Sequence, residues 1–290
     1  MSAELLRRAN PRPKDGALLR FLYRTAPGRV ALKLLCMPAL SRMAGRFLDS
    51  PLSRPLIAPF LRKNGIRRAD YLPESYRCFN DCFTRRIRPE LRPVDMAADA
   101  LIAPCDGLLS AYRIEAGAVI PAKQSRYAIA DLLGSEADAR AFEGGVCLVF
   151  RLCVENYHRY CYVDGGRALR WRKLAGELHT VRPIALESEP VFVRNCREAT
   201  LMQTDHLGLC AQIEVGAMLV GRIANHPAPP RFERGMEKGM FLYGGSTVIL
   251  LLRADCAKIE PEAFELAARE CEIPVRMGER IAALKAEKCD

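Results

Sequence analysis

The sequence is poor in the residues and spacings that build most metal sites. Its 290 residues include only four histidines, and none of its twelve cysteines forms a C-x-x-C pair. Cys78 and Cys82 lie four positions apart, but no second pair follows at the spacing of zinc ligands, so we expect no metal site. Scattered cysteines of this kind are typical of free thiols in the cytoplasm.

Long apolar runs are also missing. No stretch approaches the roughly 18 uninterrupted apolar residues of a membrane-spanning helix, and residues 1–8 lack the apolar segment of a signal peptide. No recognised DNA- or RNA-binding motif accompanies the positive charge, so we expect no nucleic-acid partner. Half of the residues are apolar, which is enough for a folded protein of one large or two small domains.

The net charge of +10 is concentrated in the N-terminal quarter. Residues 1–75 carry 15 Lys or Arg and 5 Asp or Glu, whereas the other 215 residues carry 29 of each sign. Large apolar residues such as Leu18, Phe21 and Leu34 alternate with these cations. The pattern indicates helices on an anionic membrane surface, where each cation contributes about 1 kcal/mol. The alternative is ordinary helices with an apolar face on the core and a solvated basic face.

Prolines and periodicity divide the chain into two regions. Residues 1–95 have a helical pattern, including Phe79, Phe83 and Ile87 at the spacing of one helical face. Farther on, glycines separate short β-type runs. We predict strands over 108–114, 146–152, 191–193, 210–215 and 247–252, and helices over 127–142 and 261–270. The prediction is an α+β fold, with a basic helical N-terminal region (1–95) packed on a mainly antiparallel β catalytic domain (96–290).

One short segment suggests covalent chemistry within the chain. Gly244-Gly245-Ser246-Thr247 stands directly before an apolar stretch that is predicted to be a strand. Glycine lets other groups approach the peptide carbonyl closely, so the Ser246 hydroxyl is placed to attack the carbonyl of Gly245. Near-attack geometry can lower such a barrier by about 7–11 kcal/mol. The alternative is a glycine turn that leads into a buried strand.

Three further segments carry polar side chains of the kinds used in catalysis. Pro104-Cys105-Asp106-Gly107 is a proline-led turn with a carboxylate, Tyr157-His158-Arg159-Tyr160-Cys161 follows a predicted strand, and the stretch 176–186 contains His179. Each also has a structural interpretation, because an Asp before Gly is an ordinary turn and a lone histidine often belongs to the core.

In their order along the chain, these motifs resemble those of the phosphatidylserine decarboxylases, from about residue 76 to the C-terminal end. The Gly-Gly pair before the serine is similar to the shorter bacterial branch of the family. The matching segments are Phe79-Asn80-Asp81-Cys82-Phe83-Thr84-Arg85, Pro104-Cys105-Asp106-Gly107, Tyr157-His158-Arg159, Arg182–Leu186, Glu214-Val215-Gly216-Ala217, Lys238-Gly239 and Gly245-Ser246-Thr247.

This resemblance implies a proenzyme that makes its own pyruvoyl cofactor. Attack of Ser246 on the Gly245 carbonyl would give an ester, and β-elimination would leave a β chain (1–245) and an α chain (246–290) that begins with a pyruvoyl group. The amine of phosphatidylserine would form a Schiff base there, and loss of CO2 would lead to phosphatidylethanolamine. A peripheral position on the cytoplasmic face of the cell membrane follows from the anionic lipid substrate, and the β/α pairs could form dimers.

The resemblance also implies roles for single residues. Asp106 matches the family's orienting carboxylate, His158 matches the histidine tied to decarboxylation, and His179 is a candidate for contact with the substrate. The family pattern is commonly Tyr-His-Arg-x-His, whose second histidine is the base for self-cleavage, and here Cys161 takes its place. A thiol with an ordinary pKa of about 8.5 is a poor base at neutral pH.

Three outcomes are therefore open. Cleavage could be slow, with Cys161, His158 or His179 activating Ser246. The chain could instead remain uncleaved and serve as a phospholipid-binding protein at the membrane surface, or the alignment could be locally shifted at Cys161. A decarboxylase for another serine phospholipid would keep the chemistry and change only the pocket for the lipid tail.

Overall fold

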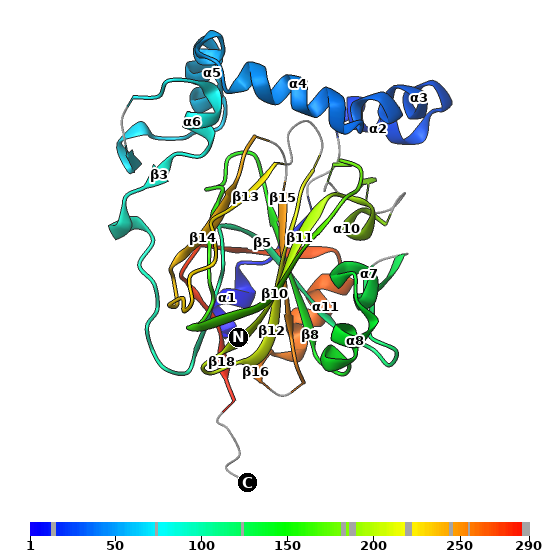
Figure 1. Cartoon of the computed structure of the whole chain (residues 1–290), viewed down its shortest axis with the longest axis vertical. Coiled ribbons are helices and arrows are strands. Elements are labelled where there is room, and N and C mark those ends of the chain that lie inside the picture. Colours follow the sequence, from blue (N-terminus) through cyan, green and yellow to red (C-terminus); the bar gives the residue numbers. More distant parts are fainter. Residues whose placement is uncertain are drawn as a thin grey trace.

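The computed structural model (Figure 1) describes residues 1–12, 16–72, 75–122, 125–180, 184–185, 190–217, 222–243, 246–254 and 256–285. A curved antiparallel sheet forms the centre, and helices from the N-terminal part of the chain run across one end of it. The predicted α+β class is confirmed.

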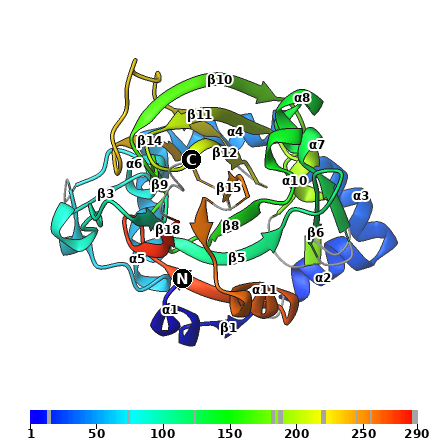
Figure 2. The ribbon, with the colours of Figure 1, turned by 90° about the horizontal axis from the view of Figure 1, so that it is seen from below.

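Eight strands form the central sheet, and every neighbouring pair is antiparallel. The sheet curls strongly when it is seen from below (Figure 2). In spatial order the strands are β1 (Asn10–Pro11), β17 (Cys271–Val275), β5 (Gly107–Arg113), β8 (Val146–Leu152), β15 (Ser246–Leu252), β12 (Gly208–Val215), β11 (Arg197–Thr204) and β10 (Gly166–Leu174).

Strand β15 shows why the centre of the sheet is stable. Alternate residues from Val248 to Leu252 pack in one apolar cluster, and the residues between them pack in a second cluster on the other face. A strand that is buried on both faces has a continuous apolar sequence rather than an alternating one. Ser246 is the first residue of this strand and pairs with Leu152 of β8.

Small sheets cover the first of these clusters. Tyr160 and Phe241 belong to one small sheet and Ile102 to another, and all three share that cluster with the central strands. The three-stranded sheets comprise β13 (Ile223–Asn225), β14 (Glu237–Phe241) and β9 (Arg159–Cys161), and β16 (Ala257–Lys258), β18 (Arg280–Leu284) and β4 (Ala100–Ile102). Two-stranded pairs are formed by β2 (Tyr71–Leu72) with β3 (Arg86–Ile87), and by β6 (Val119–Ala122) with β7 (Ser125–Ala128).

Helices cover the second cluster and extend beyond it. Leu22 and Leu32 reach into this cluster from the N-terminal helices, which therefore pack on the sheet domain. Among the described residues, no helix is long and apolar enough to cross a membrane. The helices are α1 (Ala3–Arg7), α2 (Ala17–Arg24), α3 (Ala26–Leu35), α4 (Pro38–Leu48), α5 (Ile57–Lys63), α6 (Phe79–Phe83), α7 (Ile129–Leu133), α8 (Glu136–Ala139), α10 (Val191–Arg194) and α11 (Pro261–Ala268), with 3-10 turns η1 (Pro51–Leu56), η2 (Arg68–Asp70), η3 (Pro89–Leu91) and η4 (Arg140–Phe142).

Three details of the secondary-structure prediction were wrong. The helix through Phe79 ends at Phe83, because Ile87 pairs with Tyr71 as part of β3 instead of extending the helical face. The helix over 127–142 is broken at Gly134, which adopts a left-handed conformation with φ of 65°. The short apolar run 191–193 forms helix α10 rather than a strand, since one turn is enough to bury its first two side chains against the second cluster.

Candidate active site

Ser246 begins β15 at the end of the central sheet that faces the N-terminal helices (Figure 1). The side chain is fully buried, and its hydroxyl has no hydrogen-bond partner among the described residues. A buried, unsatisfied hydroxyl costs about 1–3 kcal/mol, so the position is not explained by stability. Gly245, on the other side of the predicted cleavage site, lies outside the described residues.

His158 precedes β9 and is also fully buried. Its Nδ1 lies 2.9 Å from the carbonyl oxygen of Asn156, which can only accept, so Nδ1 carries the proton and Nε2 is a bare acceptor. Nε2 has no partner among the described residues. Burial, together with the nearby charge of Arg85, lowers the pKa of His158 to about 3. The imidazole is therefore neutral at physiological pH.

Phe83 connects His158 with the segment that leads to Ser246. The ring centroid of Phe83 lies 4.1 Å from that of His158 and 5.1 Å from that of Tyr243. The backbone N–H of Phe241 also donates to the carbonyl of His158 at 2.9 Å. The histidine and the end of β14, which precedes the Gly-Gly pair, thus lie side by side.

Asp106 stands directly before β5 and is held by an arginine rather than by a histidine. Nε of Arg92 donates to Oδ1 at 2.7 Å and Nη2 donates to Oδ2 at 2.5 Å, while the backbone N–H of Met277 donates to Oδ1 at 2.9 Å. Among the described residues no histidine forms a hydrogen bond with this carboxylate. Arg92 was missed from the sequence, where nothing in the run before Pro93 distinguishes it from other surface arginines.

Cys161 ends β9 in the same apolar cluster that Val248 of β15 enters. Since side chains alternate along a strand, Ser246 and Val248 point to the same face of β15. The backbone N–H of Cys161 donates to the carbonyl of Pro104 at 2.8 Å, which places this cysteine beside the turn of Asp106. Burial raises the pKa of Cys161 to about 12, so the side chain is a thiol rather than a thiolate.

A buried ion pair lies on the same face of the sheet. Nζ of Lys238 in β14 donates to Oε2 of Glu214 in β12 at 2.7 Å, and both side chains are almost completely buried. Glu214 pairs with Val248, two positions along β15 from Ser246. The ion pair therefore fixes β14, which leads to the Gly-Gly pair, against a neighbour of β15. From the sequence, Glu214 and Lys238 were recognised only as parts of motifs that resemble those of the family, and their pairing was not predicted.

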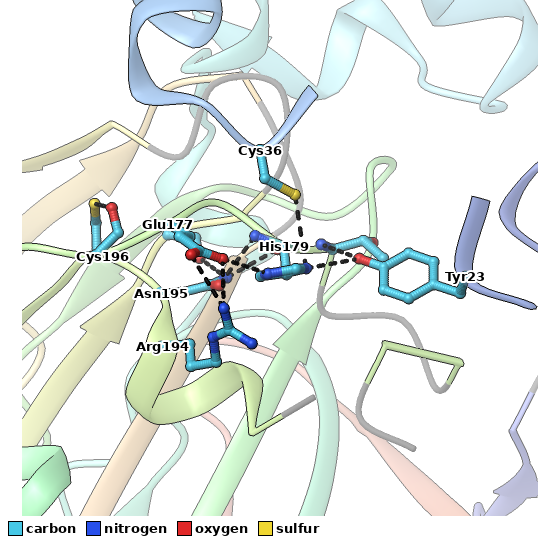
Figure 3. A network of polar contacts seen from close by, with 10 residues as sticks. Tyr23, Cys36, Glu177, His179, Arg194, Asn195 and Cys196 are labelled. Atoms are coloured by element: carbon cyan, nitrogen blue, oxygen red, sulfur yellow. Dashed lines mark hydrogen bonds and ion pairs between the residues drawn. The ribbon is translucent and has the colours of Figure 1, made fainter. Parts of the chain in front are cut away.

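His179 lies in a separate network that joins the helices to the sheet (Figure 3). Its Nε2 is 2.7 Å from Oε2 of Glu177, and its Nδ1 is 3.3 Å from the hydroxyl of Tyr23 in α2. Asn195 accepts from the backbone N–H of His179 at 3.0 Å and donates to the carbonyl of Gly216 at 2.7 Å. Gly216 follows the end of β12, so this network reaches the strand next to Ser246.

The lowered pKa of His158 predicts a pH-dependent stability. The ordinary pKa of about 6.5 applies in the unfolded chain, so between that value and the folded value of about 3 the unfolded chain binds the additional proton. Stability is therefore lost as the pH falls through this window, by up to about 1.4 kcal/mol per pH unit. We expect His158→Gln to lose less unfolding free energy than the parent between pH 7 and pH 5.

Urea unfolding followed by circular dichroism measures this difference, with Ser246→Ala as the common background so that every molecule remains one chain. Equal pH dependence of the two proteins would show that His158 is not held neutral by burial.

A sequence profile described as phosphatidylserine decarboxylase matches residues 79–283. The chain is 38% identical over 270 residues to phosphatidylserine decarboxylase proenzyme 2 of Clostridium acetobutylicum, with 92% of each chain covered. It is 37% identical over 272 residues to the phosphatidylserine decarboxylase proenzyme of Ruminiclostridium cellulolyticum, covering 92% of this chain and 91% of the relative. A Clostridium perfringens proenzyme of the same name is 36% identical over 269 residues, with 91% and 92% covered.

Proposed function

The chain belongs to the phosphatidylserine decarboxylase family, and we propose that it converts phosphatidylserine to phosphatidylethanolamine and CO2 by means of a pyruvoyl group made from Ser246. The observation that carries this proposal is the buried hydroxyl of Ser246 at the first position of β15, which has no hydrogen-bond partner in the described segments. The name proenzyme, given to the relatives, supports a precursor that requires processing. A pyruvoyl group would supply the electron sink for the pair of electrons released with CO2.

Self-cleavage would use groups of the chain itself. Oγ of Ser246 would bond to the carbonyl carbon of Gly245 while the C–N bond between them breaks, which converts the peptide to an ester. The hydroxyl proton would pass to Nε2 of His158 and then to the released amine. In the elimination that follows, a base would take the α-proton of residue 246 while its Cβ–Oγ bond breaks, so that one chain ends in the carboxylate of Gly245 and the other begins with dehydroalanine. The dehydroalanine would tautomerise to an imine, which water would hydrolyse to the pyruvoyl group and ammonia.

We assign the proton-accepting role to His158 because its Nε2 is buried and has no hydrogen-bond partner within the part of the chain that the structure describes. A general base needs an available lone pair that is basic enough to take the proton. The thiol of Cys161 keeps its own proton, and its sulfur is too weakly basic for this role. With a pKa of about 3 for its conjugate acid, His158 is a weak base, so we expect slow maturation.

Asp106 has a positioning role in this proposal. Its ion pair with Arg92 fixes the turn that accepts a backbone hydrogen bond from Cys161. This turn supports β9, and His158 immediately precedes that strand. Asp106 therefore acts through the backbone of β9 rather than through a direct contact with the imidazole.

The helices at the end of the sheet support attachment to the cytoplasmic face of the cell membrane. Leu18, Val30 and Met43 are 71%, 66% and 64% exposed, which is unusual for large apolar side chains. Exposed cations such as Arg20 and Arg46 accompany them. Apolar side chains that enter the interface and cations that face anionic lipid are the two components of peripheral binding.

The function is tested by incubating the purified chain with phosphatidylserine vesicles. We expect two fragments on denaturing electrophoresis, a mass for the smaller one that matches loss of ammonia, and release of CO2 from carboxyl-labelled phosphatidylserine. A protein that binds these vesicles but stays in one piece and releases no CO2 would instead be a phospholipid-binding member of the family.

A further inference from the structure

A cavity of about 750 Å³ lies between the N-terminal helices and the sheet domain, beside the contacts through which they pack. Helix α3 and the residues beside it form one wall. The other wall is formed by Glu177, His179 and Arg194, which are labelled in Figure 3. The volume lies within the range of roughly 300–1,000 Å³ that is usual for ligand sites. None of Ser246, His158 or Asp106 lines it, so the cavity is distinct from the candidate active site.

Cationic side chains outnumber carboxylates around this cavity. Arg29, Lys33 and Arg194 line it together with one carboxylate, Glu177. Glu177 is already engaged, since Nη2 of Arg194 donates to it at 3.1 Å and Nε2 of His179 donates to it at 2.7 Å. Burial acts to raise the pKa of Glu177, but these hydrogen bonds outweigh it and lower the pKa. Glu177 is therefore ionised and balances Arg194.

The two cations of α3 remain without a counterion. No carboxylate among the described residues forms an ion pair with Arg29 or Lys33. They lie four positions apart and therefore on the same face of the helix, where like charges destabilise it by about 0.2–0.5 kcal/mol. An anion between them would remove this repulsion. A phosphate is suited to the site because arginine and lysine both bind its oxygens.

The wall that carries Arg29 and Lys33 also presents apolar side chains. Leu32, Leu34 and Met37 line the cavity, and the last two are 60% and 48% exposed. They continue the exposed apolar surface of α3 that includes Val30. A ligand that satisfies both the cations and the apolar side chains must join an anionic group to an apolar one, which is the chemistry of a phospholipid rather than of a free anion.

We propose that this cavity binds the phosphodiester of a glycerophospholipid, with the phosphate between Arg29 and Lys33 and the glycerol and upper acyl chains along Leu34 and Met37. The inference rests on the proposed function in that both require a phospholipid at a membrane surface, and it goes beyond that function by naming a site for a lipid phosphate outside the candidate active site. The wall of the cavity is joined to the reaction centre, because Asn195 links His179 to the carbonyl of Gly216 beside β15.

Binding can be measured separately from catalysis in the full-length Ser246→Ala variant. The probe is dihexanoylphosphatidylglycerol below its micelle-forming concentration, titrated by calorimetry. We expect Arg29→Gln with Lys33→Gln to weaken binding at least about tenfold. The matched control, Arg62→Gln with Lys63→Gln, removes the same charge from exposed residues of α5 that do not line the cavity, and it should change the affinity less than about threefold.

The charge-preserving variant Arg29→Lys with Lys33→Arg should retain binding, which would exclude misfolding as the cause of the loss. Equal losses in the two neutralised pairs would overturn the proposal in favour of diffuse surface attraction. Inorganic phosphate that binds as tightly as the lipid would also overturn it, because the apolar wall would then contribute nothing. Failure of the wild-type chain to release CO2 while the variant still binds lipid would reject the proposed function and leave this site intact.

Discussion

Replacing Ser246 with alanine is expected to leave the chain as one 290-residue polypeptide and to reduce decarboxylation to the uncatalysed level. Alanine has no oxygen to attack the preceding carbonyl, so neither the ester nor the pyruvoyl group can form. The fold should persist, because the lost hydroxyl has no hydrogen-bond partner among the described residues and its removal relieves a buried unsatisfied group. Denaturing electrophoresis, mass measurement and labelling with a hydrazine reagent test each consequence.

Thr247 provides a matched control one residue farther along β15. Its hydroxyl is also fully buried and also lacks a partner among the described residues, but it points to the opposite face of the strand. Thr247→Val removes that hydroxyl at nearly constant shape, and cleavage should continue. If Ser246→Ala were still cut into two fragments, the origin of the pyruvoyl group proposed for this chain would be wrong.

The second large effect is expected at His158. His158→Gln keeps a hydrogen-bonding side chain of similar length but removes the basic nitrogen, and loss of a positioned general base costs about 10²–10⁴-fold in rate. We expect self-cleavage to slow by this factor. Cys161→Ala should change the rate less than about threefold, because burial raises the pKa of this thiol to about 12 and keeps it protonated.

The pH dependence of cleavage distinguishes these two residues further. The rate falls as the pH drops through the pKa of a general base, and for His158 that pKa is about 3. The cleavage rate in a pulse-chase experiment should therefore be nearly constant between pH 8 and pH 5. A rate that declines through pH 6.5 would indicate a solvated histidine as the base, and a rate that increases steeply above pH 8 would favour a thiolate.

The sequence predicted the strands that are buried on both faces, because burial there leaves a clear apolar pattern in the chain. The apolar runs after Ser246 and from Val146 to Leu152 each predicted a strand, because strands buried on both faces admit few polar residues. That these two strands pair at the centre of the sheet is a finding of the structure. Strand β10 was not predicted, because Leu169, Arg170 and Trp171 are exposed in succession on this edge strand and leave no regular alternation of apolar and polar residues. Its pairing with β11 is a long-range contact that no local pattern records.

The candidate site was predictable only in part for the same reason. Motif order identified Ser246, Asp106, His158 and Cys161, but their electrostatics depend on partners from distant segments. Arg92 donates hydrogen bonds to both carboxylate oxygens of Asp106. Burial disfavours the charged form of a side chain, so it lowers the pKa of His158 and raises that of Cys161. Neither effect follows from spacing along the chain.

The place of β15 within the sheet has a consequence for the mature protein. If the backbone is cut before Ser246, the shorter product begins with a strand that lies between β8 and β12, and both of these strands remain on the longer product. The shorter product also supplies β17, which pairs with β5. The two polypeptides are therefore interleaved rather than merely docked, and we expect them to separate only when the whole sheet denatures.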